Sequence, residues 1–182
     1  TIFSCTKGLA ALCLMMMANR GRLDYDAPVA DYWPAFAANG KERITVRTLL
    51  SHRAGLIALD EPITLDDIEH RIDHVDALLA QAAPRWPPGT DQGYHGVTIG
   101  LYMAALWRRL GESRSLGQFF AEEVAEPLGL DLHIGLPAEL EPRVAYLVPV
   151  DRRETLTRVV PKLAFGRGLE GRFFRAAASG KD

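Results

Sequence analysis

Ser4 and Lys7 are the two residues of this sequence whose types and spacing point most directly to chemistry. They lie three positions apart, so on a helix they share one face and the Ser4 hydroxyl can meet the Lys7 amine. A serine hydroxyl becomes a nucleophile when a neighbouring base accepts its proton, and burial lowers the pKa of a lysine so that it can be this base. The apolar run at residues 8–18 would supply the burial. The free N–H groups of the first helical turn could donate to an oxyanion.

The same spacing has an ordinary structural explanation. A serine often caps the N-terminus of a helix, and a lysine three positions later is usually solvated. The chain has five serines and four lysines. Chance places a Ser-x-x-Lys pair in roughly one chain in nine of this composition, so the pair is a hypothesis that its context must support.

Tyr94 provides part of that context. It follows the loop at residues 84–90, which contains three prolines and a glycine and cannot be helical. A tyrosine beside a lysine ammonium is biased towards the phenolate and can carry a proton between a nucleophile and a leaving atom. The alternative is an ordinary half-buried tyrosine.

The elements that must position these residues are predicted to be helices. Alternation of the kind that marks strands is almost absent, so we expect a mostly α chain. The first helix is apolar all round, which predicts a central, buried position. Thr64 and Asp67 form a capping-box pattern at the start of another helix. The expected helices are 4–19, 44–52, 64–83 with a break near Asp73, 97–110, and 116–125 capped by Ser115; residues 143–150 are expected to be extended and the tail from Lys162 poorly ordered.

Composition limits the classes of partner. The 182 residues are 48% hydrophobic and 24% charged with a net charge of −2, which fits one globular domain with a real core. No basic patch suggests nucleic acid. The run at residues 8–18 is too short to span a membrane and lacks the flanks of a signal peptide. On one helix Cys5 and Cys13 would lie about 12 Å apart, too far for a disulfide. Reduced thiols favour a cytoplasmic location.

Three further sets of residues could have either a functional or a structural role. His70 and His74 have a spacing used in metal sites, but no third ligand accompanies them, so we expect a solvated polar face and no metal. His52 is expected to be structural rather than catalytic. Aromatic side chains could line an acyl pocket, but on a helix they usually form core; these are Trp86, Tyr102 and Trp107.

Several segments in order resemble the serine β-lactamase and penicillin-binding-protein superfamily. Residues 4–7 resemble its Ser-x-x-Lys motif, residues 49–56 (LLSHRAGL) its class C segment LLSHxSGL, and residues 86–90 (WPPGT) its PGT loop. Residues 94–96 (YHG) lie where class C enzymes carry Tyr-x-Asn and are closer to the Tyr-His-x form of family VIII carboxylesterases. Residues 127–130 (PLGL) fit a further segment of that branch.

The resemblance implies a serine hydrolase that acts through an acyl-enzyme, with Ser4 as the nucleophile and Lys7 and Tyr94 as the proton-transfer groups. It implies a small ester or a β-lactam-like molecule as substrate, contacts from His95 and Gly96, and no cofactor. Gly96 replaces the asparagine that orients a β-lactam amide in the family, which argues for an esterase. A β-lactamase or a D-amino-acid peptidase is the alternative enzyme.

The family fold combines an antiparallel sheet with a helical lobe, and its third motif, on an edge strand, completes the oxyanion hole. No Lys-Thr-Gly, His-x-Gly or Trp-x-Gly tripeptide followed by a strand occurs after Tyr94. We therefore expect a single partial domain over 1–182, with 1–150 matching the family and 151–182 as a poorly defined tail. It would comprise the helical lobe and the nucleophile helix without most of the sheet. Such a chain would be a weak or inactive esterase that could self-associate through its exposed apolar helix. A non-catalytic interaction domain is the alternative.

Overall fold

The computed structural model describes residues 1–146. The chain divides into two compact units, of which one is Ile2–Glu141 and the other is Thr1 together with Pro142–Asp182. The single partial domain over 1–182 stays a prediction. The predicted extended segment at 143–150 lies partly, and the predicted tail from Lys162 wholly, outside the described residues.

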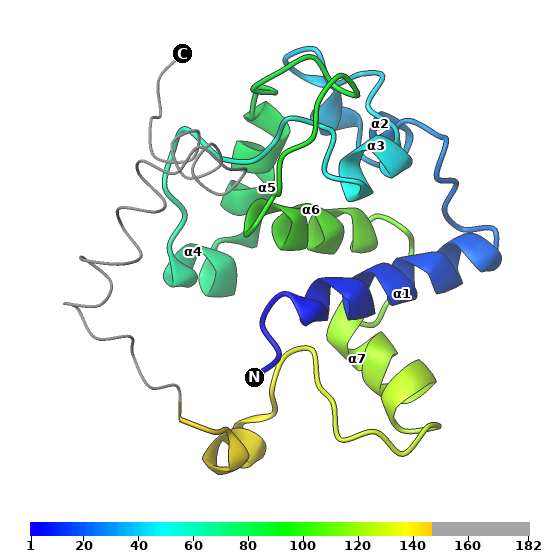
Figure 1. Ribbon diagram of the computed structural model, residues 1–182, viewed down its shortest axis with the longest axis vertical. Helices are drawn as coiled ribbons and strands as arrows, with labels where there is room; N and C mark the ends of the chain where they lie inside the picture. The colour runs from blue at the N-terminus through cyan, green and yellow to red at the C-terminus, as the bar shows by residue number, and fades with distance from the viewer. Residues whose placement is uncertain (147–182) are drawn as a thin grey trace. The chain divides into compact units, whose positions relative to one another are not determined.

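The regular elements of residues 1–146 are all helical, which confirms the expected mostly α character for this part of the chain (Figure 1). Within it no β-strand occurs, and the one sheet-like feature is an isolated antiparallel bridge between Pro28 and Thr45. None of its helices is long and apolar enough to cross a membrane. The elements are α1 Cys5–Asn19, α2 Val29–Tyr32, the 3-10 helix η1 Pro34–Ala37, α3 Val46–Leu50, α4 Leu65–His70, α5 Ile72–Gln81, α6 Thr98–Trp107, α7 Leu116–Phe120, the π-helix η2 Ala121–Ala125 and the 3-10 helix η3 Ala138–Arg143.

Helix starts follow the capping chemistry of the sequence. Thr64 and Asp67 form the predicted capping box at α4, and Ser115 forms a second one with Gln118 at α7. Thr45 caps α3 by accepting a hydrogen bond from the Thr48 N–H. The break between α4 and α5 lies at Arg71, two residues before the predicted position, and the last turn of the predicted 116–125 helix is π-helical.

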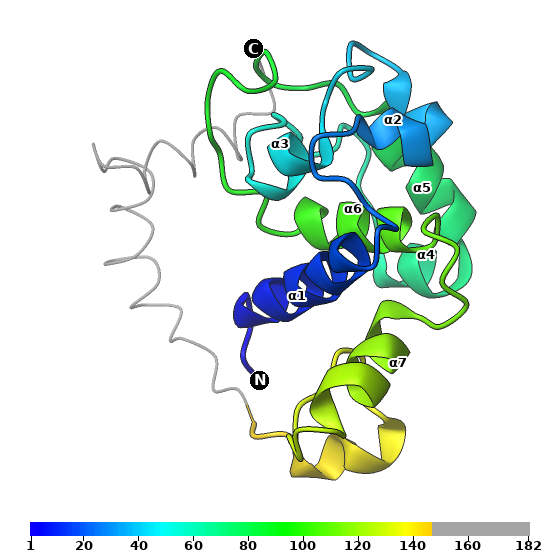
Figure 2. The same cartoon turned by 90° about the vertical axis from the view of Figure 1, so that its right-hand side faces the viewer.

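Helix α1 lies between α6 and α7, as both views show (Figure 2). Cys13, Leu14 and Met17 are completely buried on its inner side. Met15 is 52% exposed on the opposite side. The expected central position is confirmed, but burial on all sides is wrong for the described residues, because α6 and α7 lie against only part of the helix circumference.

Helix α6 forms the centre of the core. Tyr102 and Trp107 are buried within it, and their rings make edge contacts with Phe36 at 6.0 Å and Phe119 at 4.9 Å between centroids. Their polar atoms are satisfied internally, because the Tyr102 hydroxyl donates to the Leu79 carbonyl and the Trp107 indole to the Arg114 carbonyl. These two aromatic residues are therefore core, and the idea that they line an acyl pocket is wrong.

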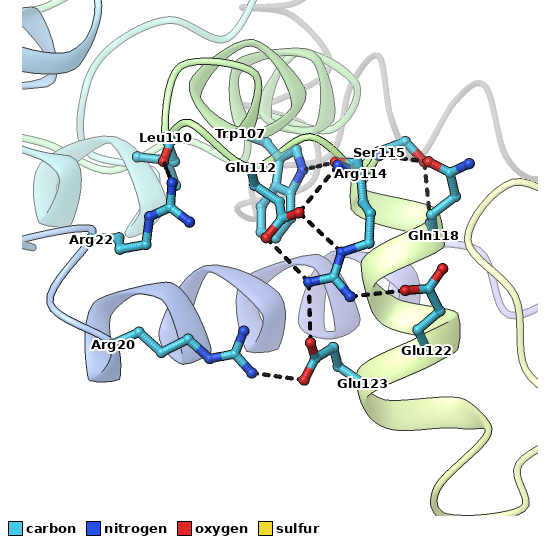
Figure 3. A network of polar contacts seen from close by, with 10 residues as sticks. All are labelled: Arg20, Arg22, Trp107, Leu110, Glu112, Arg114, Ser115, Gln118, Glu122 and Glu123. Atoms are coloured by element: carbon cyan, nitrogen blue, oxygen red, sulfur yellow. Dashed lines mark hydrogen bonds and ion pairs between the residues drawn. The ribbon is translucent and has the colours of Figure 1, made fainter.

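An ionic network links the C-terminal end of α1 to η2 and to the loop that precedes α7 (Figure 3). The Arg114 guanidinium binds the carboxylates of Glu112, Glu122 and Glu123. Glu123 also accepts from Arg20, the C-cap residue of α1, at 2.7 Å. The Arg114 guanidinium lowers the pKa of Glu112 to about 2. The network fixes the end of α1 that lies farthest from Ser4.

A buried lysine closes the end of α5. Lys41 has no exposed surface, and its ammonium donates to the carbonyls of Ala38, Ala80 and Ala82 at 2.6, 2.9 and 2.5 Å. Two of these carbonyls belong to the last turn of α5 and its C-cap, where backbone acceptors lack helical partners. Burial lowers the pKa of Lys41 to about 8. Lys41 lies in a polar stretch that is typical of an exposed loop, so its burial could not be predicted from the sequence.

Candidate active site

The Ser4 hydroxyl receives hydrogen bonds from two side chains that are far apart in the sequence. Its Oγ accepts from the Lys7 ammonium at 3.1 Å and from the Tyr94 hydroxyl at 2.6 Å. Ser4 occupies the N-cap position of α1 but makes no side-chain capping bond, and its backbone is in the right-handed helical region. The ordinary explanation of Ser-x-x-Lys as an N-cap beside a solvated lysine is therefore wrong. The three residues predicted to act together lie together.

The turn that leads into Ser4 is tight. Phe3 has a φ of 45°, a left-handed conformation that costs a residue with a side chain about 1 kcal/mol. The N–H groups of Cys5, Thr6 and Lys7 donate to the carbonyls of Ile2, Phe3 and Ser4. These N–H groups are thus occupied, and the expectation that they are free oxyanion donors is wrong.

The electrostatics of the site centre on Tyr94 rather than on a buried lysine. The Lys7 nitrogen lies 5.3 Å from the centroid of the Tyr94 ring. The Ser4 hydroxyl and the Lys7 ammonium can each donate a hydrogen bond to an ionised Tyr94 oxygen, and these bonds together with the Lys7 charge lower the pKa of Tyr94 by favouring the phenolate. Ser4 is exposed, Lys7 is only half-buried and Tyr94 is 42% exposed. The prediction that the apolar run of α1 buries Lys7 is therefore wrong.

The Tyr94 loop is held by the segment at residues 51–56, the one that resembles a family motif. Main-chain hydrogen bonds join Gly55 O to Arg85 N–H, Arg53 O to Gly89 N–H and His52 O to Gly93 N–H. The Arg53 guanidinium also donates to the Gly89 carbonyl. A loop without regular structure is thereby fixed against the end of α3 over most of its length.

His95 is completely buried behind this loop. Its Nε2 accepts from the Leu56 N–H at 2.9 Å, and its Nδ1 lies 2.7 Å from the Gly93 carbonyl, to which it must donate. Its own N–H donates to Nδ1 of His52 at 3.0 Å. Burial lowers the pKa of His95 to about 4. Both ring nitrogens therefore face protein groups, and the predicted substrate contact by His95 stays a prediction that its geometry does not favour.

Gly96 lies directly beside the catalytic candidate. A Cβ atom placed on Gly96 would lie 3.5 Å from Cε1 of Tyr94, at ordinary contact distance. A side chain at this position would therefore extend along the Tyr94 ring. The predicted role of residue 96 at the substrate is compatible with this placement and stays a prediction.

The histidines suspected of metal binding do not share a helix. His70 ends α4 and lies 3.8 Å from Glu69, whereas His74 belongs to α5 and lies 3.8 Å from Glu61. In the part of the chain that the structure describes, no group of three or more histidine, cysteine, aspartate or glutamate side chains could hold a metal ion.

Comparison with known proteins places these residues in a family. The Beta-lactamase family model matches residues 1–180. The chain is 39% identical over 183 aligned positions to the Esterase/beta-lactamase LipL of Mycobacterium tuberculosis, an alignment that covers 97% of this chain and 42% of that protein.

Solved structures give the same answer. A family VIII carboxylesterase superposes with a TM-score of 0.75 and 46% identity over 81% of this chain and 41% of that one. A penicillin-binding-protein homologue from Caulobacter crescentus superposes with a TM-score of 0.74 and 44% identity over 81% and 39%. The chain spans about two fifths of the length of these relatives. With its Ser4–Lys7–Tyr94 cluster at the start of α1, this chain belongs to the Beta-lactamase family.

Proposed function

We propose that this chain forms an acyl-enzyme with small carboxylic esters, with Ser4 as nucleophile and Lys7 and Tyr94 as proton-transfer groups. The observation that carries the proposal is the pair of hydrogen bonds on Ser4 Oγ, from Lys7 at 3.1 Å and from Tyr94 at 2.6 Å. A hydroxyl that caps a helix would face backbone N–H groups, whereas this one faces two groups that can exchange protons with it.

The lowered pKa of Tyr94 supports its role as the proton acceptor. In its phenolate form Tyr94 accepts the Ser4 proton as Oγ attacks the ester carbonyl carbon, while the Lys7 ammonium stabilises the negative charge beside it. The tetrahedral intermediate then collapses, the bond to the alcohol oxygen breaks, and Tyr94 returns the proton to the leaving alkoxide. Water then attacks the carbonyl carbon of the acyl-enzyme, Tyr94 accepts the proton of the water, and the bond to Ser4 Oγ breaks as Tyr94 returns that proton to it, which releases the acid.

Esters are the preferred substrate class because of residue 96. An amide side chain at that position would extend beside Tyr94 and could pair with an amide of the substrate, and glycine offers neither donor nor acceptor. The name of the M. tuberculosis relative joins esterase and β-lactamase activity, and a relative from the solved structures is a family VIII carboxylesterase. In Gly96→Asn we expect the ratio of β-lactam to ester turnover to rise, since contacts of 3.5 Å admit the new side chain.

Turnover by this chain alone should be slow. The first-turn N–H groups Cys5, Thr6 and Lys7 already donate to carbonyls, so they do not serve as oxyanion donors without rearrangement. A missing oxyanion donor costs on the order of 3 kcal/mol of transition-state stabilisation. Because the described residues are helical and the chain spans about two fifths of the length of its relatives, we propose that it corresponds to the helical lobe and nucleophile helix of the family fold. The occupied first-turn N–H groups favour the second candidate, a non-catalytic relative that acts as an interaction domain.

Intact-mass measurement after treatment with a fluorophosphonate tests the proposal. We expect slow, stoichiometric labelling of the wild-type chain and none in Ser4→Ala. This control keeps the exposed thiol of Cys5, so an adduct on the neighbouring cysteine would persist in it and be recognised. Tyr94→Phe, which removes one hydroxyl, should label at least tenfold more slowly. Absence of labelling in a chain that is folded by circular dichroism would refute the enzymatic proposal and leave the interaction domain.

A further inference from the structure

We propose that His52 is a positioning residue that holds the peptide groups on both sides of Tyr94 and so fixes its phenol against Ser4. Its main-chain carbonyl accepts from the Gly93 N–H at 3.1 Å, and its imidazole Nδ1 accepts from the His95 N–H at 3.0 Å. Gly93 and His95 are the two neighbours of Tyr94 in the chain. One residue therefore holds both flanks of the catalytic tyrosine, and this inference rests on the function proposed above for Tyr94.

The imidazole of His52 also contacts the tyrosine ring itself. The two ring centroids are 5.2 Å apart with an angle of 49° between the planes. Two backbone anchors and one ring contact from the same residue restrict both the main chain and χ1 of Tyr94, which is what a hydroxyl 2.6 Å from a nucleophile requires.

The bond from His95 fixes the protonation state of His52. Because Nδ1 accepts a hydrogen bond, the ring must be neutral with its proton on Nε2. Burial and the charge of Lys7 both lower the pKa of His52, which keeps the ring in this state. An imidazolium would lose the acceptor and release the His95 peptide.

The backbone of His52 narrows the choice of test variants. Its φ is 62°, in the left-handed region that glycine and asparagine tolerate best. Asparagine places an amide oxygen close to the position of Nδ1, so His52→Asn keeps both the backbone and the acceptor. Glycine keeps the backbone and removes the acceptor and the ring. Comparison of His52→Asn with His52→Gly therefore distinguishes the loss of the positioning contacts from an effect of backbone strain.

The experiment compares His52→Asn and His52→Gly by two readouts. The first is the rate of Ser4 labelling by a fluorophosphonate. The second is the pKa of Tyr94, followed by NMR on carbon-labelled tyrosine and assigned with Tyr94→Phe, which reports the position of the phenol without turnover. We expect His52→Asn to stay within about threefold of wild type in labelling, and His52→Gly to fall at least tenfold. In His52→Gly the Tyr94 pKa should rise towards its ordinary value of 10.0, since the bonds that lower it are lost.

Asn39→Gly is the matched control, because Asn39 also has a left-handed φ, 57°, and its side chain also makes one hydrogen bond to the main chain, donated to the Gln81 carbonyl. It should lose stability without a change in either readout. If His52→Gly does not fold, His52→Gln keeps a side chain of similar size but misplaces the acceptor, and should raise the Tyr94 pKa in the same direction.

The outcomes separate the two proposals. An unchanged Tyr94 pKa in a folded His52→Gly or His52→Gln variant overturns the positioning role, whatever the labelling shows. A Tyr94 pKa that rises as expected, in a chain whose Ser4 is never labelled, supports the positioning role and overturns the proposed esterase function.

Discussion

Acidification should destabilise this protein in part through the buried imidazole of His95. The pKa of His95 in the folded chain is about 4, against 6.5 for the ordinary side chain, and its cause is burial. A histidine whose folded pKa is depressed contributes stability that is present above the unfolded pKa and is lost as the pH falls towards the folded one. The relevant window is therefore pH 6.5 to about 4.

The magnitude follows from the two pKa values. A separation of about 2.5 units corresponds to about 3 kcal/mol at pH values below both, at 1.36 kcal/mol per unit. At pH 5 the folded ring is still neutral and the unfolded ring is almost fully protonated, so about 2 kcal/mol of the unfolding free energy is already lost. The structural reason is that a protonated Nε2 cannot accept from the Leu56 N–H.

Urea unfolding at pH 7 and pH 5 measures this loss. The His95→Gln variant carries an amide oxygen that can accept from Leu56 and does not titrate, so its drop between the two pH values should be about 2 kcal/mol smaller than that of the wild type. His70→Gln, at a position that is mostly exposed, should keep the wild-type drop. Equal drops in wild type and His95→Gln would refute the assignment of acid sensitivity to this ring.

Three further substitutions test the packing that surrounds the site, each by urea or thermal unfolding. Gly117→Ala should lower the free energy of unfolding by at least about 2 kcal/mol, since its Cβ would lie 2.0 Å from a backbone carbonyl oxygen. Gly100→Ala, whose Cβ meets nothing within 4 Å, should raise the free energy of unfolding by about 0.5–1 kcal/mol. Equal effects of the two substitutions would contradict the packing of α7. Lys41→Met should lower the free energy of unfolding by about 3 kcal/mol, because three carbonyls lose their hydrogen-bond donor. The surface control Arg43→Met should change it by less than about 0.5 kcal/mol. An unchanged stability in Lys41→Met would show that water replaces the ammonium. Arg114→Met should lower the melting temperature by an amount that shrinks as salt is added, and a salt-independent shift would mean that the ion pairs contribute little.

Local chemistry made much of the fold predictable. Thr64 with Asp67, and Ser115 with Gln118, have the spacing of a capping box, which predicts a helix start, and both capping boxes are present. The Ser4–Lys7 contact follows from the geometry of one helical turn. The contact between Tyr94 and Ser4 could not be predicted from spacing, because 90 residues separate the two and nothing local joins them. The position of Tyr94 after a proline-rich loop, and the family resemblance, indicated this residue instead.

Tertiary contacts account for what could not be predicted. The sequence around Lys41 is typical of a surface residue, and its burial results from tertiary contacts with the carbonyls at the end of α5. The bond between His52 and the His95 N–H joins two motifs that the sequence shows only as separate segments. Which side of α1 is exposed could not be predicted from its apolar run, because apolar content gives no information on which sides neighbouring helices cover.

The length of helix α1 makes the position of Ser4 sensitive to small rotations at the other end of the helix. Its 15 residues span about 22 Å, with the nucleophile at one end and the Arg20–Glu123 ion pair at the other. A rotation of about 3° about the anchored end would displace Ser4 by about 1 Å, a misplacement that can cost an enzyme about a hundredfold in rate. A salt bridge remote from the chemistry is thus in a position to set the alignment of the attacking oxygen, and substitutions that loosen it would be felt first at Ser4.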